Sequence, residues 1–126
     1  MPYDALKAPD PQDWLDLDEQ ERIDQVIDYH RRNHLLLGGN AKLHGAAHVV
    51  VENQIAMGDA TAVPATFKRL MEEGLDRHEA IHAVGSVLMG IVFDVIRKVD
   101  DEANINAKYR RELAALTAAS WRAQKD

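Results

Sequence analysis

The chain has 126 residues, of which 46% are hydrophobic and 29% charged, with a formal net charge of -6 at pH 7. The acidic balance argues against a nucleic-acid partner held through phosphate contacts, and the lack of cysteine excludes disulfides and thiolate metal ligands. No run approaches about 18 consecutive apolar residues and the N-terminus lacks the features of a signal peptide, so we expect a cytoplasmic protein without a membrane partner.

The chain length predicts a single domain, residues 1–126. We expect this domain to be helical and to begin with an extended arm. Residues 1–12 carry three of the four prolines and show no hydrophobic periodicity, so we expect this segment to be the extended arm. Trp14, Leu15 and Leu17 are expected to attach its end to the core.

Helical periodicity predicts four main helices and one short connecting helix. Asp18 with Glu21, and Asp76 with Glu79, have the spacing of capping boxes at helix N-termini. Pro64 suits the first turn of the short connector. No strand pattern competes, so the sequence predicts an all-α fold packed as an irregular helical bundle. The expected helices are residues 18–38, 40–58, 64–74, 76–98 and 105–121.

Residues 44–54 read as a helix that is apolar on nearly every side yet carries ionisable groups. His44, His48 and Glu52 follow one another at four-residue spacing and form one slanted stripe. The face with Val49 and Asn53 is the one whose composition suits water. Burying ionisable groups without partners costs several kcal/mol each, so another polar group must lie opposite the stripe.

All six histidines fall into three pairs with four-residue spacing. Side chains at this spacing stack about 6 Å apart on a helix and can offer two ligands to one ion. Two helices that each contribute a pair supply the nitrogen and oxygen ligands that suit zinc, or part of the shell of iron, manganese, nickel or copper. The pairs are His30 with His34, His44 with His48, and His78 with His82.

These pairs predict a divalent transition-metal site between the second and fourth helices. The leading ligand set is His48, Glu52, His78 and His82, whose positions face a common interior. Further candidates, as alternative ligands or as groups around the ligands, are His44, His30 and His34. Catalytic, redox and purely structural roles of the ion all stay open, and the sequence assigns no enzyme activity.

A metal-free interpretation is the main alternative. His30 and His34 lie near a helix C-terminus, where the helix dipole favours imidazolium. His44 and His48 can equally be core histidines that hydrogen-bond to neighbouring polar groups. The chain would then be a helical interaction protein whose buried histidine network titrates near neutral pH. Its Ala-rich last helix would provide a homodimer surface.

Two known types of metal site match only part of the pattern. Residues 78–82 fit the HExxH motif of zinc hydrolases, but the match lies in the first helical turn, no sheet accompanies it, and Glu79 has a capping role. Ferritin-like sites need two Glu-x-x-His motifs, whereas Glu79 and His82 supply one. The order of the pairs also resembles the first three helices of hemerythrin, a di-iron oxygen carrier, but no histidine follows His82 in the last helix.

From about residue 28 to 97 the chain resembles a bacterial family of small helical proteins with a domain of unknown function. The resemblance is carried by His30 and His34, HGAAHVVVENQ at 44–54, Pro64, Leu70 and RHEAIHAVGSVL at 77–88. It covers a little over half of the chain. It implies that the histidine pairs and the Glu-Asn-Gln segment act as one functional unit, without saying what that unit does.

Overall fold

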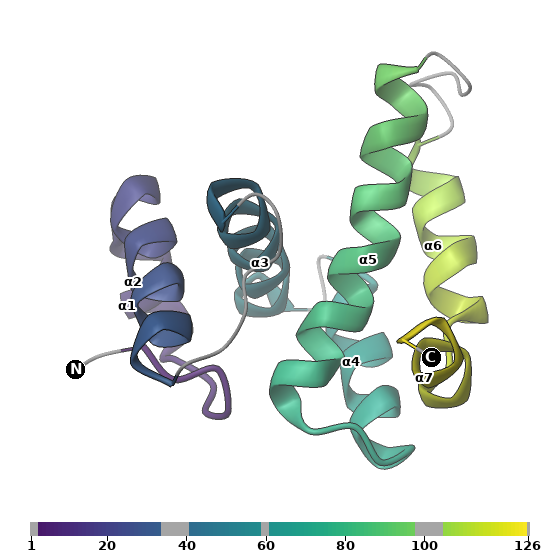
Figure 1. Cartoon of the computed structure of the whole chain (residues 1–126), viewed down its shortest axis with the longest axis horizontal. Coiled ribbons are helices and arrows are strands. Elements are labelled where there is room, and N and C mark those ends of the chain that lie inside the picture. Colours follow the sequence, from purple (N-terminus) through teal and green to yellow (C-terminus); the bar gives the residue numbers. More distant parts are fainter. Residues whose placement is uncertain (1–2, 34–40, 59–60, 98–104, 126) are drawn as a thin grey trace.

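The computed structural model describes residues 3–33, 41–58, 61–97 and 105–125, and these residues form helices without strands (Figure 1). The all-α prediction is therefore confirmed for the described part of the chain. The described residues form seven helices rather than four plus a connector. They are α1 (Pro11–Asp16), α2 (Glu19–Arg32), α3 (Ala41–Ala56), α4 (Val63–Glu72), α5 (Arg77–Ile96), α6 (Ile105–Ala115) and α7 (Ala118–Lys125).

The two extra helices, α1 and α7, come from local capping chemistry. Asp10 accepts a hydrogen bond from the backbone N–H of Asp13, and Pro11 occupies the first turn, so α1 starts inside the predicted arm. The expected last helix divides into α6 and α7 because Thr117 and Ser120 cap a new N-terminus. In that pair, each side chain bonds the backbone N–H of the other, as in a capping box.

The other helix boundaries follow the predicted signals more closely. Asp18 and Asp76 cap α2 and α5 as expected, through the backbone N–H groups of Gln20 and Glu79. Helix α2 ends at Arg32, earlier than predicted, with Asn33 as its C-cap. The predicted stop at residues 38–39 and the predicted cap at residue 40 lie outside the described residues.

Helix α3 is the central element of the fold. In Figure 1 it lies between α1 and α2 on one side and α5 on the other, with α6 and α7 beyond α5, and α4 contacts both α3 and α5. One hydrophobic cluster joins Trp14, Val26 and Val49 with residues of the N-terminal arm. A second cluster joins Val51 with α4, α5 and the C-terminal helices. Polar side chains on α3 therefore lie between two apolar cores.

The face of α3 that was expected to meet water is packed instead. Val49 is only 1% exposed, and Asn53 accepts hydrogen bonds from the indole of Trp14 and the guanidinium of Arg22, at 2.9 and 3.1 Å. This expectation was wrong because α1 and α2 cover that side of the helix. Val50, on another face, is one of the exposed apolar residues.

Close packing of α2 on α3 depends on a glycine. A Cβ atom added at Gly45 would lie 3.1 Å from Cγ1 of Ile27 and 3.6 Å from Cγ2 of Ile23. The two helices therefore approach each other where α3 has no side chain. This contact lies in the middle of α2, at Ile23 and Ile27.

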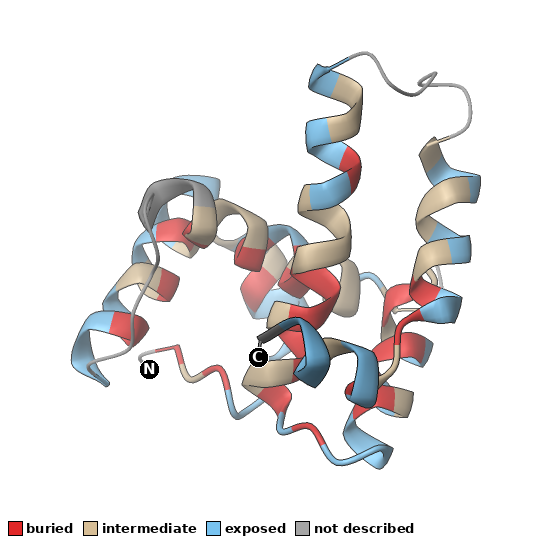
Figure 2. Ribbon diagram, turned by 45° about the vertical axis from the view of Figure 1, so that its right-hand side comes forward, coloured by how far each residue is buried: buried red, intermediate tan, exposed pale blue. Residues whose placement is uncertain are grey.

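Helix α5 differs strongly in burial between its two halves. Its first half is mostly buried, while its second half leaves Val92, Phe93 and Ile96 exposed (Figure 2). By length and composition this helix is long and apolar enough to cross a membrane, a test that the core helix of a soluble protein also passes. Its buried half places Arg77, His78 and His82 against α3, so this half of the helix forms part of the core.

Candidate metal centre

Four histidines from three helices converge in the interior. His30 comes from α2, His48 from α3, and His78 and His82 from α5. One ring nitrogen of each lies within 4.8 Å of those of the other three, so this four-histidine cluster could hold a metal ion. His30 is 0% and His48 2% exposed, while His78 and His82 are half-buried.

The cluster is assembled by helix register and helix packing together. The Asp76 cap fixes the start of α5, and the four-residue spacing then brings the rings of His78 and His82 to a centroid distance of 4.2 Å. His48 faces them because α3 packs against α5. His30 reaches the same point from the last turn of α2, and its ring lies 4.9 Å from that of His78.

Two pairs of ring nitrogens approach each other closely. The Nε2 atoms of His30 and His78 are 3.1 Å apart, and those of His44 and His82 are 3.3 Å apart. Nδ1 of His30 lies 2.8 Å from the carbonyl oxygen of Val26, which can only accept, so Nδ1 carries the donated proton. In neutral His30, the Nε2 lone pair is consequently directed at the cluster.

A buried polar group lies behind His48. Arg77 donates hydrogen bonds of 2.7 and 2.8 Å to the two carboxylate oxygens of Glu52, and both side chains are almost fully buried. The hydroxyl of Tyr3 donates to the same carboxylate and lies 2.9 Å from Nε2 of His48. This places the N-terminal arm in direct contact with the cluster.

The other ring nitrogen of His48 has no hydrogen-bond partner. Among buried side-chain nitrogen and oxygen atoms of the described residues, Nδ1 of His48 is the one without a partner. An unpaired buried polar atom costs about 1–3 kcal/mol and calls for an explanation such as a bound ion. Burial, reinforced by the neighbouring histidines His78 and His82, holds the pKa of His48 well below its usual value. The ring is therefore neutral and has a lone pair to offer.

The pKa values of His78 and His82, and of the neighbouring His44, are also lowered. Burial, with the charge of His30, lowers the pKa of His78 to about 4. Burial, with the charge of His78, lowers the pKa of His82 to about 3. The pKa of His44 is lowered first by burial and second by the charge of His30. At neutral pH these imidazoles are in the form that binds metal ions.

The structure brings most of the predicted residues together, with one change in the leading set. His48, His78 and His82 gather as expected, and the fourth member of the cluster is His30, where the expected set has Glu52. Glu52 lies behind His48 in its ion pair. His44 lies beside His82 at the edge of the cluster. His34 lies outside the described residues.

Two residues of the site were not singled out from the sequence. Arg77 directly precedes His78, and its position at the start of the RHEAIH segment was the available signal. Tyr3 lies in an aperiodic segment, and no feature of the sequence indicates that it returns to the core. Both contacts depend on tertiary packing.

Glu79 does not complete a hydrolytic HExxH arrangement with the cluster. Its carboxylate accepts a 2.6 Å hydrogen bond from the indole N–H of Trp121 in α7. Its backbone N–H donates to Asp76, as expected for the N-terminal turn. The glutamate thus joins α5 to the C-terminal helix.

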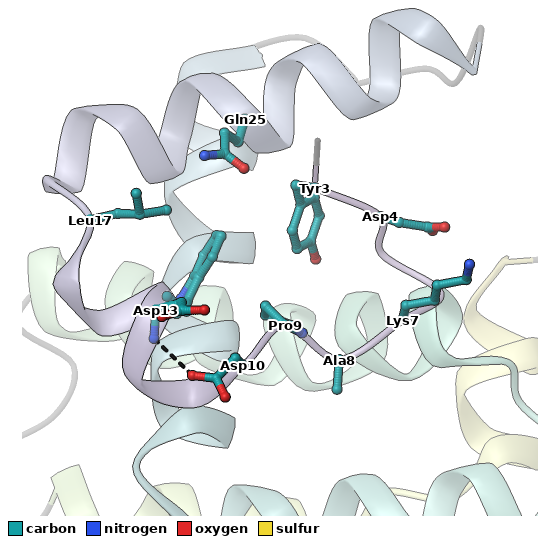
Figure 3. Close-up of a pocket in the computed structure, with 10 residues that line it drawn as sticks. Tyr3, Asp4, Lys7, Ala8, Pro9, Asp10, Asp13, Leu17 and Gln25 are labelled. Atoms are coloured by element: carbon teal, nitrogen blue, oxygen red, sulfur yellow. Dashed lines mark hydrogen bonds between the residues drawn. The ribbon is translucent and has the colours of Figure 1, made fainter. Parts of the chain in front are cut away.

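A cavity of about 540 Å³ lies under the N-terminal arm (Figure 3). It is bounded by the arm, α1 and α2, and its walls include Asp4, Asp10 and Gln25. None of the four cluster histidines lines it. Tyr3 is the residue that this cavity and the surroundings of His48 share.

The described residues thus define an all-α protein with a buried histidine cluster that could hold a metal ion. Comparisons with models of known protein families, with curated proteins and with solved structures find no match.

Proposed function

We propose that this protein binds one divalent transition-metal ion through His30, His48, His78 and His82. The observation that carries the proposal is the convergence of four imidazoles from three helices, one of which has a buried nitrogen without a partner. Neutral imidazole nitrogens are common metal ligands, and four of them make a complete tetrahedral shell.

The spacing of the ring nitrogens is close to what a single ion requires. A tetrahedral zinc with Zn–N bonds of about 2.0–2.1 Å holds its nitrogen ligands about 3.3–3.4 Å apart. The Nε2 atoms of His30 and His78 are already 3.1 Å apart, and all four ligand atoms lie within 4.8 Å of one another. Metal binding then needs only a small inward movement of the rings.

The donor set favours particular metals among those expected from the sequence. Imidazole suits zinc, copper, iron and nickel, whereas manganese prefers carboxylate and water. The Glu52 carboxylate is occupied by Arg77 and Tyr3. We therefore place zinc, copper, nickel and iron ahead of manganese, and use zinc as the probe because it readily adopts tetrahedral nitrogen coordination.

The position of the ligands favours a structural role for the ion. Each of α2, α3 and α5 contributes at least one ligand, so one ion would connect three helices. Metal binding that occurs only in the folded state adds to the free energy of unfolding. Removing the metal with a chelator should lower the melting temperature by several degrees.

Zinc titration of metal-free protein against a competing chelator tests this proposal. Wild type should bind one zinc per chain, and His48→Ala or His30→Ala should lose more than about 100-fold in affinity, because even residues behind the ligands typically cost 10- to 100-fold. His44→Ala is the matched control, since His44 lies outside the four-histidine cluster, and its loss should be much smaller. Absence of stoichiometric binding in wild type would rule the proposal out.

A metal-free histidine network is the second candidate function. The 3.1 and 3.3 Å distances between Nε2 atoms also fit hydrogen bonds in which one imidazole of each pair donates. In that case the cluster would contribute to folding as a polar network without an ion. The same titration separates the two candidates, because the network predicts no stoichiometric zinc and no effect of the chelator on melting.

A further inference from the structure

We infer that Tyr3 is a positioning residue that keeps the proton of His48 on Nε2 and thereby leaves Nδ1 as its metal-binding atom. The assignment of Nδ1 as a metal ligand rests on the proposed function. The assignment of the His48 proton to Nε2 rests on hydrogen-bond chemistry alone. It makes the N-terminal arm part of the metal centre, although the arm contributes no ligand.

The first step is the charge of Glu52. Arg77 donates one hydrogen bond to each of its two carboxylate oxygens, at 2.7 and 2.8 Å, in a pair with 6% and 1% exposure. A guanidinium has only donors, so a buried carboxylate bound in this way is ionised and can only accept. The hydroxyl of Tyr3, which also contacts this carboxylate, must therefore be the donor.

The second step follows from the single proton of a phenol. Because the one O–H of Tyr3 donates its hydrogen bond to Glu52, the Tyr3 oxygen can only accept a hydrogen bond from its second neighbour. That neighbour is Nε2 of His48, at 2.9 Å. Nε2 must carry a proton to make this bond. In a neutral imidazole, Nδ1 then has no proton and carries a free lone pair. Nδ1 of His48 is the buried atom that lacks a partner.

The arm is held so that the hydroxyl cannot easily turn away. Arg32 donates to the carbonyl oxygen of Tyr3 at 2.9 Å, and Arg77 donates to that of Ala5 at 3.0 Å. The ring of Tyr3 packs against those of Trp14 and Tyr29, with centroid distances of 5.3 and 5.8 Å. Burial and the nearby charge of Glu52 raise the pKa of Tyr3, so the phenol keeps its proton.

The two fully buried ligands would then use different ring nitrogens. His30 donates from Nδ1 to the carbonyl of Val26 and offers Nε2, whereas His48 donates from Nε2 to Tyr3 and offers Nδ1. In each case the hydrogen bond made by one nitrogen selects the other as ligand, as is usual for histidines bound to metals. For His48 the selecting group is supplied by a residue 45 positions away.

The test combines Tyr3→Phe with Tyr109→Phe as matched control. Tyr109 is partly buried, and the Tyr109→Phe change likewise removes a phenol hydrogen bond, to Gln54 at 2.8 Å, without touching the cluster. Nitrogen-15 NMR of metal-free wild type should show His48 protonated at Nε2, and Tyr3→Phe should show a mixture of the two neutral forms. Zinc affinity should fall about 10- to 100-fold in Tyr3→Phe and remain unchanged in Tyr109→Phe.

Different results would overturn different claims. A wild-type His48 protonated at Nδ1 would contradict the inference whether or not zinc binds, and so would equal zinc affinity in wild type and Tyr3→Phe. A wild type that binds no zinc but carries the His48 proton on Nε2 would refute the proposed function and the metal-binding half of this inference, while supporting the tautomer assignment. The NMR measurement on wild type does not depend on how well Tyr3→Phe folds.

Discussion

Arg77 and Glu52 form a two-point ion pair inside the interface of α5 and α3, with hydrogen bonds of 2.7 and 2.8 Å. Removing one partner leaves the other charge buried, which typically costs about 3–5 kcal/mol. Arg77→Met should therefore lower the free energy of unfolding of metal-free protein by that amount in urea denaturation.

The control for this prediction is a more exposed ion pair at the C-terminal end of α5. Arg97 contacts Asp94 at 3.4 Å with 68% of its side chain exposed, and such pairs contribute at most about 1 kcal/mol. Arg97→Met should change stability little. Combining Arg77→Met with Glu52→Leu should recover part of the loss, because both charges are then gone. If Arg77→Met and Arg97→Met lowered the free energy of unfolding by similar amounts, the buried pair would not have the predicted effect on stability.

Two glycines in helices should respond oppositely to alanine. Gly90 is exposed in α5 with no heavy atom within 4 Å of an added Cβ, so Gly90→Ala should stabilise by about 0.5–1 kcal/mol through helix propensity. At Gly45 an added Cβ would lie 3.1 Å from Cγ1 of Ile27. Gly45→Ala should give no such gain, as measured by thermal unfolding. Equal gains at both positions would show that α2 and α3 do not pack closely at Gly45.

The stability of metal-free protein should fall in acid below the usual histidine pKa. The pKa of His78 is about 4 and that of His82 about 3 in the folded state, against 6.5 for both when unfolded. Between these values the unfolded chain binds more protons, so the free energy of unfolding decreases as the pH falls from about 6.5 toward 3. Urea denaturation across this range measures the slope.

A double variant provides the control for the acid prediction. Replacing His78 and His82 with glutamine removes the two groups whose pKa values fall to about 4 and about 3 in the folded state. The decrease in stability between pH 6.5 and 4 should then be smaller than in wild type. An unchanged slope would mean that other groups cause the acid sensitivity.

Glu79→Gln should leave zinc binding nearly intact. The Glu79 carboxylate bonds the indole of Trp121 rather than joining the four-histidine cluster. Chelator competition should give a zinc affinity close to that of wild type, whereas His82→Ala should bind far more weakly. A loss in Glu79→Gln as large as in His82→Ala would place the glutamate at the metal after all.

Histidine spacing made much of the cluster predictable, because four-residue pairs on a helix share a face wherever the helix lies. His48, His78 and His82 were identified in this way. The place of His30 depends on how α2 crosses α3 at Gly45, which periodicity within one helix does not contain. The same holds for Glu52, whose partner Arg77 belongs to another helix.

The fold shows a similar division. The caps at Asp18 and Asp76 are local signals and were correctly read. The break at Thr117 is also local, but the alanine-rich pattern on both sides favoured one continuous helix. The return of Tyr3 to the core is a tertiary contact made by a segment without periodicity, so no pattern predicted it.

X-ray absorption spectroscopy of zinc-loaded wild type tests the central claim most directly. Four imidazole nitrogens at about 2.0–2.1 Å, with the outer-shell scattering of imidazole rings, are expected if His30, His48, His78 and His82 bind one ion. A coordination shell with two or fewer imidazoles would contradict this claim. So would a protein that fails to bind one zinc ion per chain.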